Sequence, residues 1–221
     1  MWKKGLLVAC CALMFAGLQA QEIKKVMIIG NSIMKHGKAP QLGWNSDWGM
    51  AATAEEKDYA HQLYAKICAA LKQEKAPELK LARISDENHM KGWDGLKGND
   101  ADVIVIQLSD NYRGKENAEE FQNNYSQMIR DLRGDRDPLI VCLTNWGGGK
   151  KNEMIRAAAK ENNVLSVNLA PLAANPQNKA KSEGHFTNGG VNWHPGDRGM
   201  AAIADAAFAA IEKPLKAKAA K

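Results

Sequence analysis

Short apolar runs alternate along the chain with stretches in which apolar residues recur at helical spacing. The runs predict five strands, at residues 24–30, 79–85, 102–109, 138–144 and 164–169. The stretches predict four main helices, at residues 54–74, 116–134, 152–163 and 197–213, with Asp197 as the N-cap of the last one. The run DVIVIQLS at 102–109 is almost continuously apolar, which is typical of a strand buried on both faces of a parallel sheet.

This order of elements predicts the fold class. Strands that alternate with helices through connections of crossover length indicate an α/β protein in which helices cover both faces of one parallel sheet. We therefore expect a three-layer α/β/α sandwich with a flavodoxin-like, five-stranded parallel sheet in the order 2-1-3-4-5. Ligands of such sheets bind beyond the carboxyl ends of the strands where the strand order reverses, which here is between the first and third strands.

Two terminal segments are expected to lie outside the folded domain. Residues 1–20 combine a basic start, a short apolar run and a final small residue, which predicts a signal peptide cleaved after Ala20 and a secreted or periplasmic protein. A lipoprotein is an alternative, because the stretch LVAC ends at Cys10, but it would leave a very short signal. We expect residues 21–213 to form a single domain and residues 214–221 to form a flexible basic tail.

Charge and cysteine content narrow the class of protein. The net charge is +5, but the basic residues are scattered and form no stripe, so nucleic-acid binding is not expected. No apolar stretch of membrane length follows residue 20, so no membrane association is expected once the signal is removed. Cys68 and Cys142 are the cysteines beyond the signal, which excludes a disulfide framework and leaves a single bridge open.

Three polar stretches fall where ligands of this fold class would bind. GNS ends at Ser32 after the first predicted strand, and QLSDN ends at Asn111 after the third. HPGDRGM begins at His194 and opens the last predicted helix. Because the carboxyl ends of parallel strands meet at one edge of the sheet, we expect the three residues to lie close together.

In order and spacing, these stretches resemble the first, third and fifth sequence blocks of the SGNH (GDSL-type) hydrolase family. The resemblance covers essentially the whole chain after residue 20. It implies that Ser32 is a nucleophile, that His194 is its general base, and that the Asn111 amide and the Ser32 backbone N–H form an oxyanion hole. The alternatives are an ordinary turn serine at Ser32, a structural histidine at His194 and a helix N-cap at Asn111.

The position of the expected acid departs from the family pattern. The family usually has Asp three residues before the His, and this chain has Val191 there. The imidazole could instead be held by a backbone carbonyl, by the Asn192 side chain, or by Asp94 or Asp110 from other loops. A Ser–His dyad is the arrangement that we expect.

Two oxyanion-hole positions also depart from the pattern. The third block usually begins with Gly, where this chain has Ser109. The second block, in which a Gly supplies a backbone N–H, has no clear match, and Gly92 is the candidate for it. These departures bear on how many donors the site offers to a substrate.

Large aromatic residues are expected around the same edge of the sheet. The five tryptophans beyond residue 20 and Tyr112 all lie in predicted loops, and such side chains suit stacking on sugar faces or aryl groups. The alternative is that several of them only pack the long loop 33–53 onto the body of the protein. The candidates for substrate binding are Trp44, Trp48, Trp93, Tyr112, Trp146 and Trp193.

The resemblance implies acyl transfer through a serine ester, without a cofactor. We expect an exported esterase that removes a small acyl group such as acetyl from a small-molecule or glycan ester. Residues His36, His61, His89 and His185 lack metal-ligand spacing, so no metal site is predicted. A lipase or thioesterase for long acyl chains is disfavoured, because the loops lack runs of Leu, Ile and Val. The alternative from another class is a non-catalytic carbohydrate-binding protein on a degenerate hydrolase fold.

Overall fold

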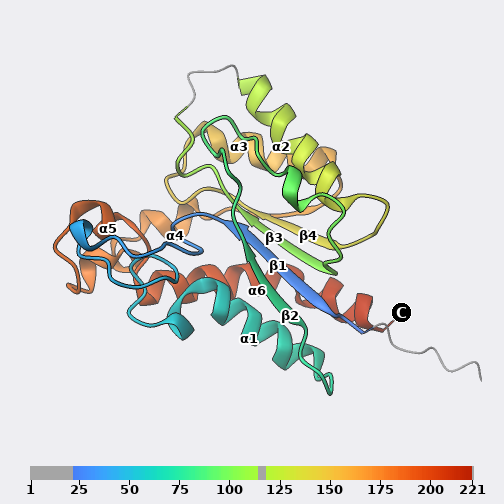
Figure 1. The fold of residues 1–221 in the computed structure, drawn as a ribbon, viewed down its shortest axis with the longest axis horizontal. Helices are drawn as coiled ribbons and strands as arrows, with labels where there is room; N and C mark the ends of the chain where they lie inside the picture. Colours follow the sequence, from blue (N-terminus) through green and yellow to red (C-terminus); the bar gives the residue numbers. More distant parts are fainter. Residues whose placement is uncertain (1–21, 114–117, 221) are drawn as a thin grey trace, which may run out of the picture.

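The computed structural model, which describes residues 22–113 and 118–220, has a five-stranded parallel sheet between two layers of helices (Figure 1). The strand order is β2-β1-β3-β4-β5, so the predicted fold class and strand order are confirmed. The strands are β1 (Lys25–Gly30), β2 (Glu78–Ala82), β3 (Val103–Gln107), β4 (Leu139–Leu143) and β5 (Leu165–Val167). The helices are α1 (Tyr59–Leu71), α2 (Ala118–Arg133), α3 (Lys150–Glu161), α4 (Ala170–Ala174), α5 (Gly189–Trp193) and α6 (Asp197–Ala219).

Alternate residues of the central strands face opposite helical layers. Val26 and Ile28 of β1 pack in a core with α1 and α6, whereas Met27 and Ile29 pack in a second core with α2 and α3. Both sets are fully buried, which explains why the central strands are continuously apolar rather than alternating. Full burial of each such side chain contributes about 1.5–3 kcal/mol, so the two cores hold the sheet between its helical layers.

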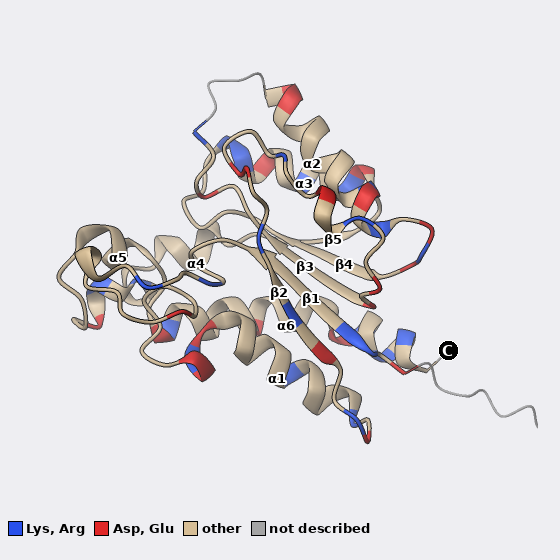
Figure 2. Ribbon diagram, in the orientation of Figure 1, with Lys and Arg blue, Asp and Glu red and all other residues tan. Residues whose placement is uncertain are grey.

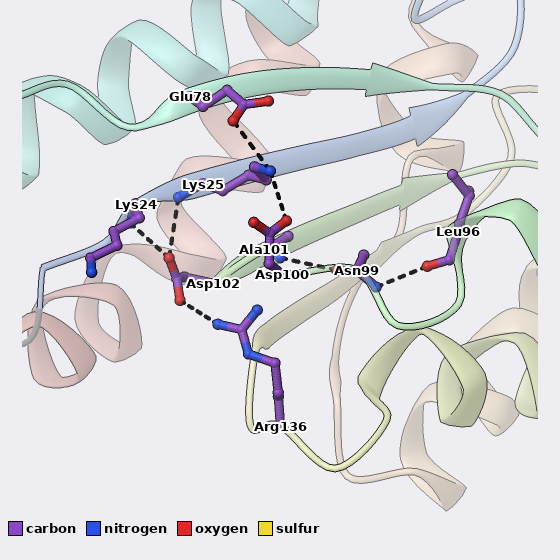
Figure 3. A network of polar contacts seen from close by, with 9 residues as sticks. All are labelled: Lys24, Lys25, Glu78, Leu96, Asn99, Asp100, Ala101, Asp102 and Arg136. Atoms are coloured by element: carbon purple, nitrogen blue, oxygen red, sulfur yellow. Dashed lines mark hydrogen bonds and ion pairs between the residues drawn. The ribbon is translucent and has the colours of Figure 1, made fainter.

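A polar network closes the amino end of the sheet (Figure 3). The Asp102 carboxylate, which is 5% exposed, accepts the backbone N–H of Lys24 at 2.7 Å and that of Lys25 at 3.1 Å, and it pairs with Arg136 at 2.9 Å. The Lys25 ammonium lies 2.7 Å from Asp100 and 3.2 Å from Glu78. Strands β1, β2 and β3 are therefore tied together at this end by cations and carboxylates in contact.

The last helix begins and ends differently from the prediction. Its N-cap is Gly196, and the backbone N–H groups of Asp197 and Arg198 donate to the Glu183 carboxylate at 2.9 Å each. The Asp197 carboxylate instead accepts the N–H and hydroxyl of Thr53, so the predicted N-cap role of Asp197 was wrong.

The predicted boundary at residue 213 is also corrected. Helix α6 continues through Pro214 to Ala219, so residues 214–219 are part of the helix and not a flexible tail. Leu215 is fully buried in the core shared with α1, and the Lys218 ammonium donates to the Asp137 carbonyl at 2.5 Å. Burial of an apolar side chain one residue after Pro214 is what holds this end of the helix against the body.

The two cysteines are free thiols on opposite faces of the sheet. Cys142 of β4 is buried in the core with α2 and α3, whereas Cys68 belongs to α1, which covers the other face. The open question of a bridge between them is thereby resolved, because the sheet separates them. Burial raises the pKa of the Cys142 thiol to about 12, so it behaves as a small apolar core residue.

Charge is spread over the surface without segregation. Lys and Arg are interspersed with Asp and Glu over the helices and loops (Figure 2). Among residues 22–113 and 118–220, no helix has both the length and the apolar character needed to cross a membrane. The predicted signal peptide, residues 1–20, lies outside the described residues.

Candidate active site

Ser32 lies in a tight turn directly after β1. The N–H groups of Met34 and Lys35 both donate to the Asn31 carbonyl at 2.8 Å, so the chain turns as soon as the strand ends. A Cβ atom on Gly30 would lie 2.6 Å from the Cβ of Met34 and 3.1 Å from the Gln107 carbonyl oxygen. Glycine is therefore required at the end of β1, because the turn packs directly on the strand. The turn leaves Ser32 half-buried at the carboxyl edge of the sheet.

His194 follows α5 and reaches this serine across 162 residues of sequence. Its Nε2 lies 2.8 Å from the Ser32 Oγ, and its Nδ1 lies 2.8 Å from the Gly190 carbonyl oxygen. A carbonyl oxygen only accepts hydrogen bonds, so Nδ1 carries the proton and Nε2 presents its lone pair to the serine hydroxyl. The Asn188 side chain accepts the N–H groups of Gly190 and Val191, which fixes the turn that supplies this carbonyl.

Burial gives His194 the protonation state of a general base. The side chain is almost wholly buried, and desolvation lowers its pKa to about 4. The imidazole is therefore neutral at neutral pH. A neutral ring with Nε2 in hydrogen-bond reach of a hydroxyl is able to remove its proton during nucleophilic attack.

The three side-chain candidates for orienting His194 have other partners, which corrects those assignments. The Asn192 amide donates to the Phe186 carbonyl at 2.9 Å, and its Oδ1 is buried without a hydrogen-bond partner in the described part of the chain. Asp94 pairs with Lys97 at 2.7 Å. Of the alternatives left open by the sequence, a backbone carbonyl is the one in contact with the imidazole.

Asp110, the third candidate, joins the loops that follow β3 and β4. Its carboxylate accepts the Gln107 amide at 2.5 Å and the backbone N–H groups of Trp146 at 2.9 Å and Gly147 at 3.3 Å. Burial raises the pKa of Asp110 to about 6, against the opposing effect of these hydrogen bonds. The half-buried Asp110 thus connects two loops at this edge of the sheet.

Glu87 is a site residue that the sequence analysis missed. Its carboxylate is 6% exposed, and it accepts hydrogen bonds from the Asn31 amide, the Ser109 backbone N–H and, at 2.8 Å, the Asn111 amide. Asn31 precedes Ser32 in the sequence. Because the Asn31 and Asn111 amides share Glu87 as their acceptor, the Asn111 amide is held close to the Asn31 side chain. The signal available in the sequence was the place of Glu87 just after β2, whose carboxyl end lies beside that of β1.

The Asn111 side chain contacts a carboxylate: its amide nitrogen donates to Glu87 at 2.8 Å. Two residues earlier, Ser109 has φ +89, a left-handed conformation that favours glycine. The family resemblance predicts glycine at this position, and the backbone retains the corresponding conformation with a serine side chain.

Gly92, the candidate for a second oxyanion donor, closes the loop that carries Glu87. It has φ +85, and a Cβ atom there would lie 2.1 Å from the Ser85 Oγ. Its carbonyl accepts the Ser85 N–H at 3.4 Å, and Asp86 pairs with Lys91 inside the loop. Loop geometry therefore accounts for a glycine at this position. The predicted role of the Gly92 backbone N–H as a second oxyanion donor stays a prediction.

Most of the predicted aromatic ring is packed into the protein. Trp44 is buried beside Trp48, whose indole N–H donates to the Ala52 carbonyl. Trp93 is buried in the core with α2 and donates to Asp131, and Tyr112 packs its ring on Phe121. For Trp44 and Trp93 the substrate-binding prediction is corrected, because their rings fill the interior.

The remaining two tryptophans line a cavity that borders Trp193, the residue before His194. Trp193 is 38% exposed, and its ring lies edge-on to the His194 imidazole with centroids 5.4 Å apart. Trp146 is buried and donates its indole N–H to the Trp193 carbonyl at 3.2 Å. The cavity has a volume of about 250 Å³ and is lined by Trp146, Gly147, Gly148, Ala170, Ala173, Ala174, Lys179 and Trp193.

No group of three or more His, Cys, Asp or Glu side chains within residues 22–113 and 118–220 is arranged to hold a metal ion. The groups at this edge of the sheet are a serine, a neutral histidine, amide donors and buried carboxylates. These are groups for nucleophilic and acid–base chemistry.

Known proteins resemble this chain in structure rather than in sequence. No family model and no curated protein matches it. A two-domain esterase active on acetylated mannans is 16% identical, with a TM-score of 0.56 over 89% of this chain. The alignment covers 50% of that esterase, so this chain spans about half its length.

Two further solved structures align along almost their whole length. An acetyl xylan esterase, AlAXEase, is 18% identical, with a TM-score of 0.55 over 85% of this chain and 99% of its own. A Parabacteroides merdae protein assigned as a GDSL-like lipase is 16% identical, with a TM-score of 0.55 over 90% of this chain and 99% of its own. The chain has an SGNH/GDSL hydrolase-type fold. The fold implied by the sequence blocks at Ser32, Asn111 and His194 is therefore confirmed.

Proposed function

We propose that this protein is an exported serine esterase that hydrolyses a small acyl ester, such as an acetyl ester, on a carbohydrate. The observation that carries the proposal is the 2.8 Å contact between the Ser32 Oγ and the Nε2 of a neutral His194. The Ser32 hydroxyl contacts the His194 imidazole, and the imidazole in turn contacts the Gly190 carbonyl. A serine is activated by such a base when a third group orients the base.

In the proposed reaction, the Ser32 Oγ attacks the ester carbonyl carbon while its proton passes to His194 Nε2. The oxyanion that forms accepts the Ser32 backbone N–H and one N–H of the Asn111 amide. When the intermediate collapses, the alcohol leaves with the proton from Nε2 and an acyl-serine remains. Water then attacks the acyl-serine, His194 takes and returns a proton in the same way, and the free acid and Ser32 are regenerated.

In this site the Gly190 carbonyl accepts the Nδ1 hydrogen bond that the acid of a catalytic triad would accept. In a triad, the acid holds the imidazole in the correct tautomer and stabilises its charged form, and an amide replacement that gives the wrong tautomer costs about 10⁴ in rate. A carbonyl facing Nδ1 enforces the correct tautomer, but it stabilises the imidazolium only as a dipole. We therefore expect a working dyad that is slower than a complete triad.

The substrate class is proposed from the cavity that borders Trp193. Its indole and small side chains suit a compact acyl group or a sugar face, and its limited volume disfavours a long acyl chain. Two structural neighbours bear names that state activity on acetylated mannans and on acetyl xylan, which supports a glycan ester.

The test uses the chain without residues 1–20, comparing wild type with Ser32→Ala on p-nitrophenyl acetate and on acetylated mannan and xylan. We expect turnover that Ser32→Ala abolishes, together with labelling of Ser32 by a fluorophosphonate probe mapped by mass spectrometry. Turnover equal in both proteins and an unlabelled Ser32 would overturn the proposal. Retained glycan binding in that case would favour the non-catalytic carbohydrate-binding alternative.

Export is proposed from the sequence of residues 1–20 alone. Expression of the full chain in a bacterial host is expected to give a periplasmic or secreted protein whose first residue is Gln21. A mature protein that retains residues 1–20 would contradict this part of the proposal.

A further inference from the structure

The Glu87 carboxylate gathers three N–H donors from the point where the strand order reverses. Its Oε2 accepts the amide nitrogens of Asn31 and Asn111, and its Oε1 accepts the backbone N–H of Ser109. Asn31 follows β1, whereas Ser109 and Asn111 follow β3, so one side chain connects the two segments that flank the site.

The contacts fix the direction of two amide groups. The two ends of an Asn amide have nearly the same shape, and the hydrogen-bond partners decide which end points where. The Glu87 Oε2 is the acceptor of both contacts, so Asn31 and Asn111 both turn their nitrogens toward Glu87. Arg83 completes the assignment, because its Nε donates to the Asn31 Oδ1 at 3.0 Å.

Within residues 22–113 and 118–220, one hydrogen of the Asn111 amide has no acceptor and can face a substrate. The amide nitrogen has two N–H bonds, and the carboxylate takes one of them. The second is held in a direction set by the first, since the amide group is planar. The contact with Glu87 therefore aims a donor instead of consuming it.

We propose that Glu87 is a positioning residue that aims the oxyanion-hole donor of Asn111 and holds the backbone of Ser109 in its left-handed conformation. The inference rests on the proposed esterase function of Ser32 and His194. Glu87 does not touch the reacting atoms; it acts through the Asn111 amide and through the Ser109–Asn111 turn.

A carboxylate suits this task better than an amide. Three donors converge on Glu87, and a glutamine would offer a single acceptor oxygen and turn its own NH₂ toward at least one donor. Such a donor–donor contact would displace Asn31, Ser109 or Asn111. A shift of about 1 Å in a catalytic donor costs roughly 10²-fold in rate.

A merely structural role would behave differently, and the chain supplies the comparison. Asp102 is also a buried carboxylate that accepts two backbone N–H groups, but it lies at the amino end of the sheet (Figure 3), whereas Ser32 follows the carboxyl end of β1. Asp102→Asn is therefore the matched control for Glu87→Gln. Both substitutions remove one charge and keep the shape of the side chain.

The experiment measures kcat and KM on p-nitrophenyl acetate, and the melting temperature, for wild type, Glu87→Gln and Asp102→Asn. We expect Glu87→Gln to lower kcat about 10²-fold while KM changes less than about threefold, and Asp102→Asn to lower the melting temperature while kcat stays within about twofold. The double variant Asn31→Asp with Glu87→Gln exchanges the carboxylate and the amide between the two contacting positions, so the side-chain contact between 31 and 87 is kept. It is expected to recover at least about tenfold of the lost kcat.

Unchanged kcat in a folded Glu87→Gln, or a loss matched by Asp102→Asn, would overturn the role of Glu87. If Glu87→Gln does not fold, Glu87→Asp keeps the acceptors on a shorter side chain and is expected to lower kcat about tenfold. A folded Glu87→Asp with wild-type kcat would overturn the role equally. Failure of the proposed function is distinguishable, because wild type would then show no Ser32-dependent turnover at all.

Discussion

The two ends of the parallel sheet bury carboxylates in opposite ways. At the amino end, Asp102 contacts the guanidinium of Arg136, and Lys25 lies between two further carboxylates. At the carboxyl end, Glu87 and Asp110 accept N–H groups from amides alone, and no ion pair involves either of them among residues 22–113 and 118–220. Asp102 is thus paired with a guanidinium, whereas the oxygens of Glu87 and Asp110 are contacted by neutral N–H donors.

Under the proposed function, this difference predicts that the amino end serves stability and that the carboxyl end serves the reaction. Cations in contact with carboxylates satisfy them and leave nothing for a ligand. Neutral donors on a carboxylate leave ionisation and proton position sensitive to the surroundings, as the raised pKa of Asp110 and the lowered pKa of His194 indicate. Among the described residues, the buried polar side-chain atoms without a hydrogen-bond partner include those of Ser109, Asn145 and Asn192, and also the hydroxyls of Tyr59 and Tyr125.

The largest expected effect at the carboxyl end follows from His194→Ala. Removing the base should lower kcat/KM at least about 10³-fold without unfolding the protein, because the serine proton then has no acceptor. Steady-state hydrolysis of p-nitrophenyl acetate measures this, with the exposed His185→Ala as the control that keeps activity. If His194→Ala kept more than about a tenth of the wild-type rate, His194 would not be the base, and the carboxyl end would lose its proposed catalytic role.

Asn111→Ala is expected to lower kcat about 10²- to 10³-fold with little change in KM, since one oxyanion donor is lost. Asn99→Ala is the matched control at the amino end, where the Asn99 amide donates to the Leu96 carbonyl (Figure 3) and to the Leu132 carbonyl. Asn99→Ala should cost stability and leave kcat unchanged. Equal losses of kcat in both variants would show that the two ends do not differ in function.

Asp102→Asn should lower the free energy of unfolding by about 1–3 kcal/mol, because two backbone N–H groups and Arg136 lose a charged acceptor. The lower part of that range is expected if the half-exposed Arg136 turns to solvent. Urea unfolding followed by circular dichroism measures it. A variant as stable as wild type would show that the amino-end network does not hold the strands together.

The pH profile should show the smallest effect over the ordinary working range. His194 has a pKa lowered to about 4 by burial, so the neutral base predominates above that pH and is lost as pH falls through it. We expect kcat/KM to change less than about twofold from pH 5 to 8 and to fall about tenfold per unit below pH 4. An acid limb near pH 6 that disappears in Asp110→Asn would assign the control to Asp110 instead.

The sequence predicted most of the fold and part of the site. Strand β3 and its neighbours were predicted because a buried parallel strand requires an uninterrupted apolar run, and local composition reveals it. The carboxyl-terminal boundary was missed because Pro214 indicates the end of a helix, whereas burial of Leu215 in the core carries α6 onward. The tryptophans were predicted around the site from their loop positions, but loop position does not distinguish a ring that faces solvent from one that fills the interior.

What the sequence by itself determined is the α/β order and three polar segments, GNS, SDN and HP, that follow strands or precede the last helix. Spacing and residue type fix those features locally, and parallel strands bring their carboxyl ends to one edge. Only the tertiary structure decided that the Gly190 carbonyl faces His194 and that Glu87, from a loop with no motif, gathers Asn31 and Asn111. A backbone carbonyl has no signature in the sequence, and a lone carboxylate becomes an acceptor for three donors only when the chain folds around it.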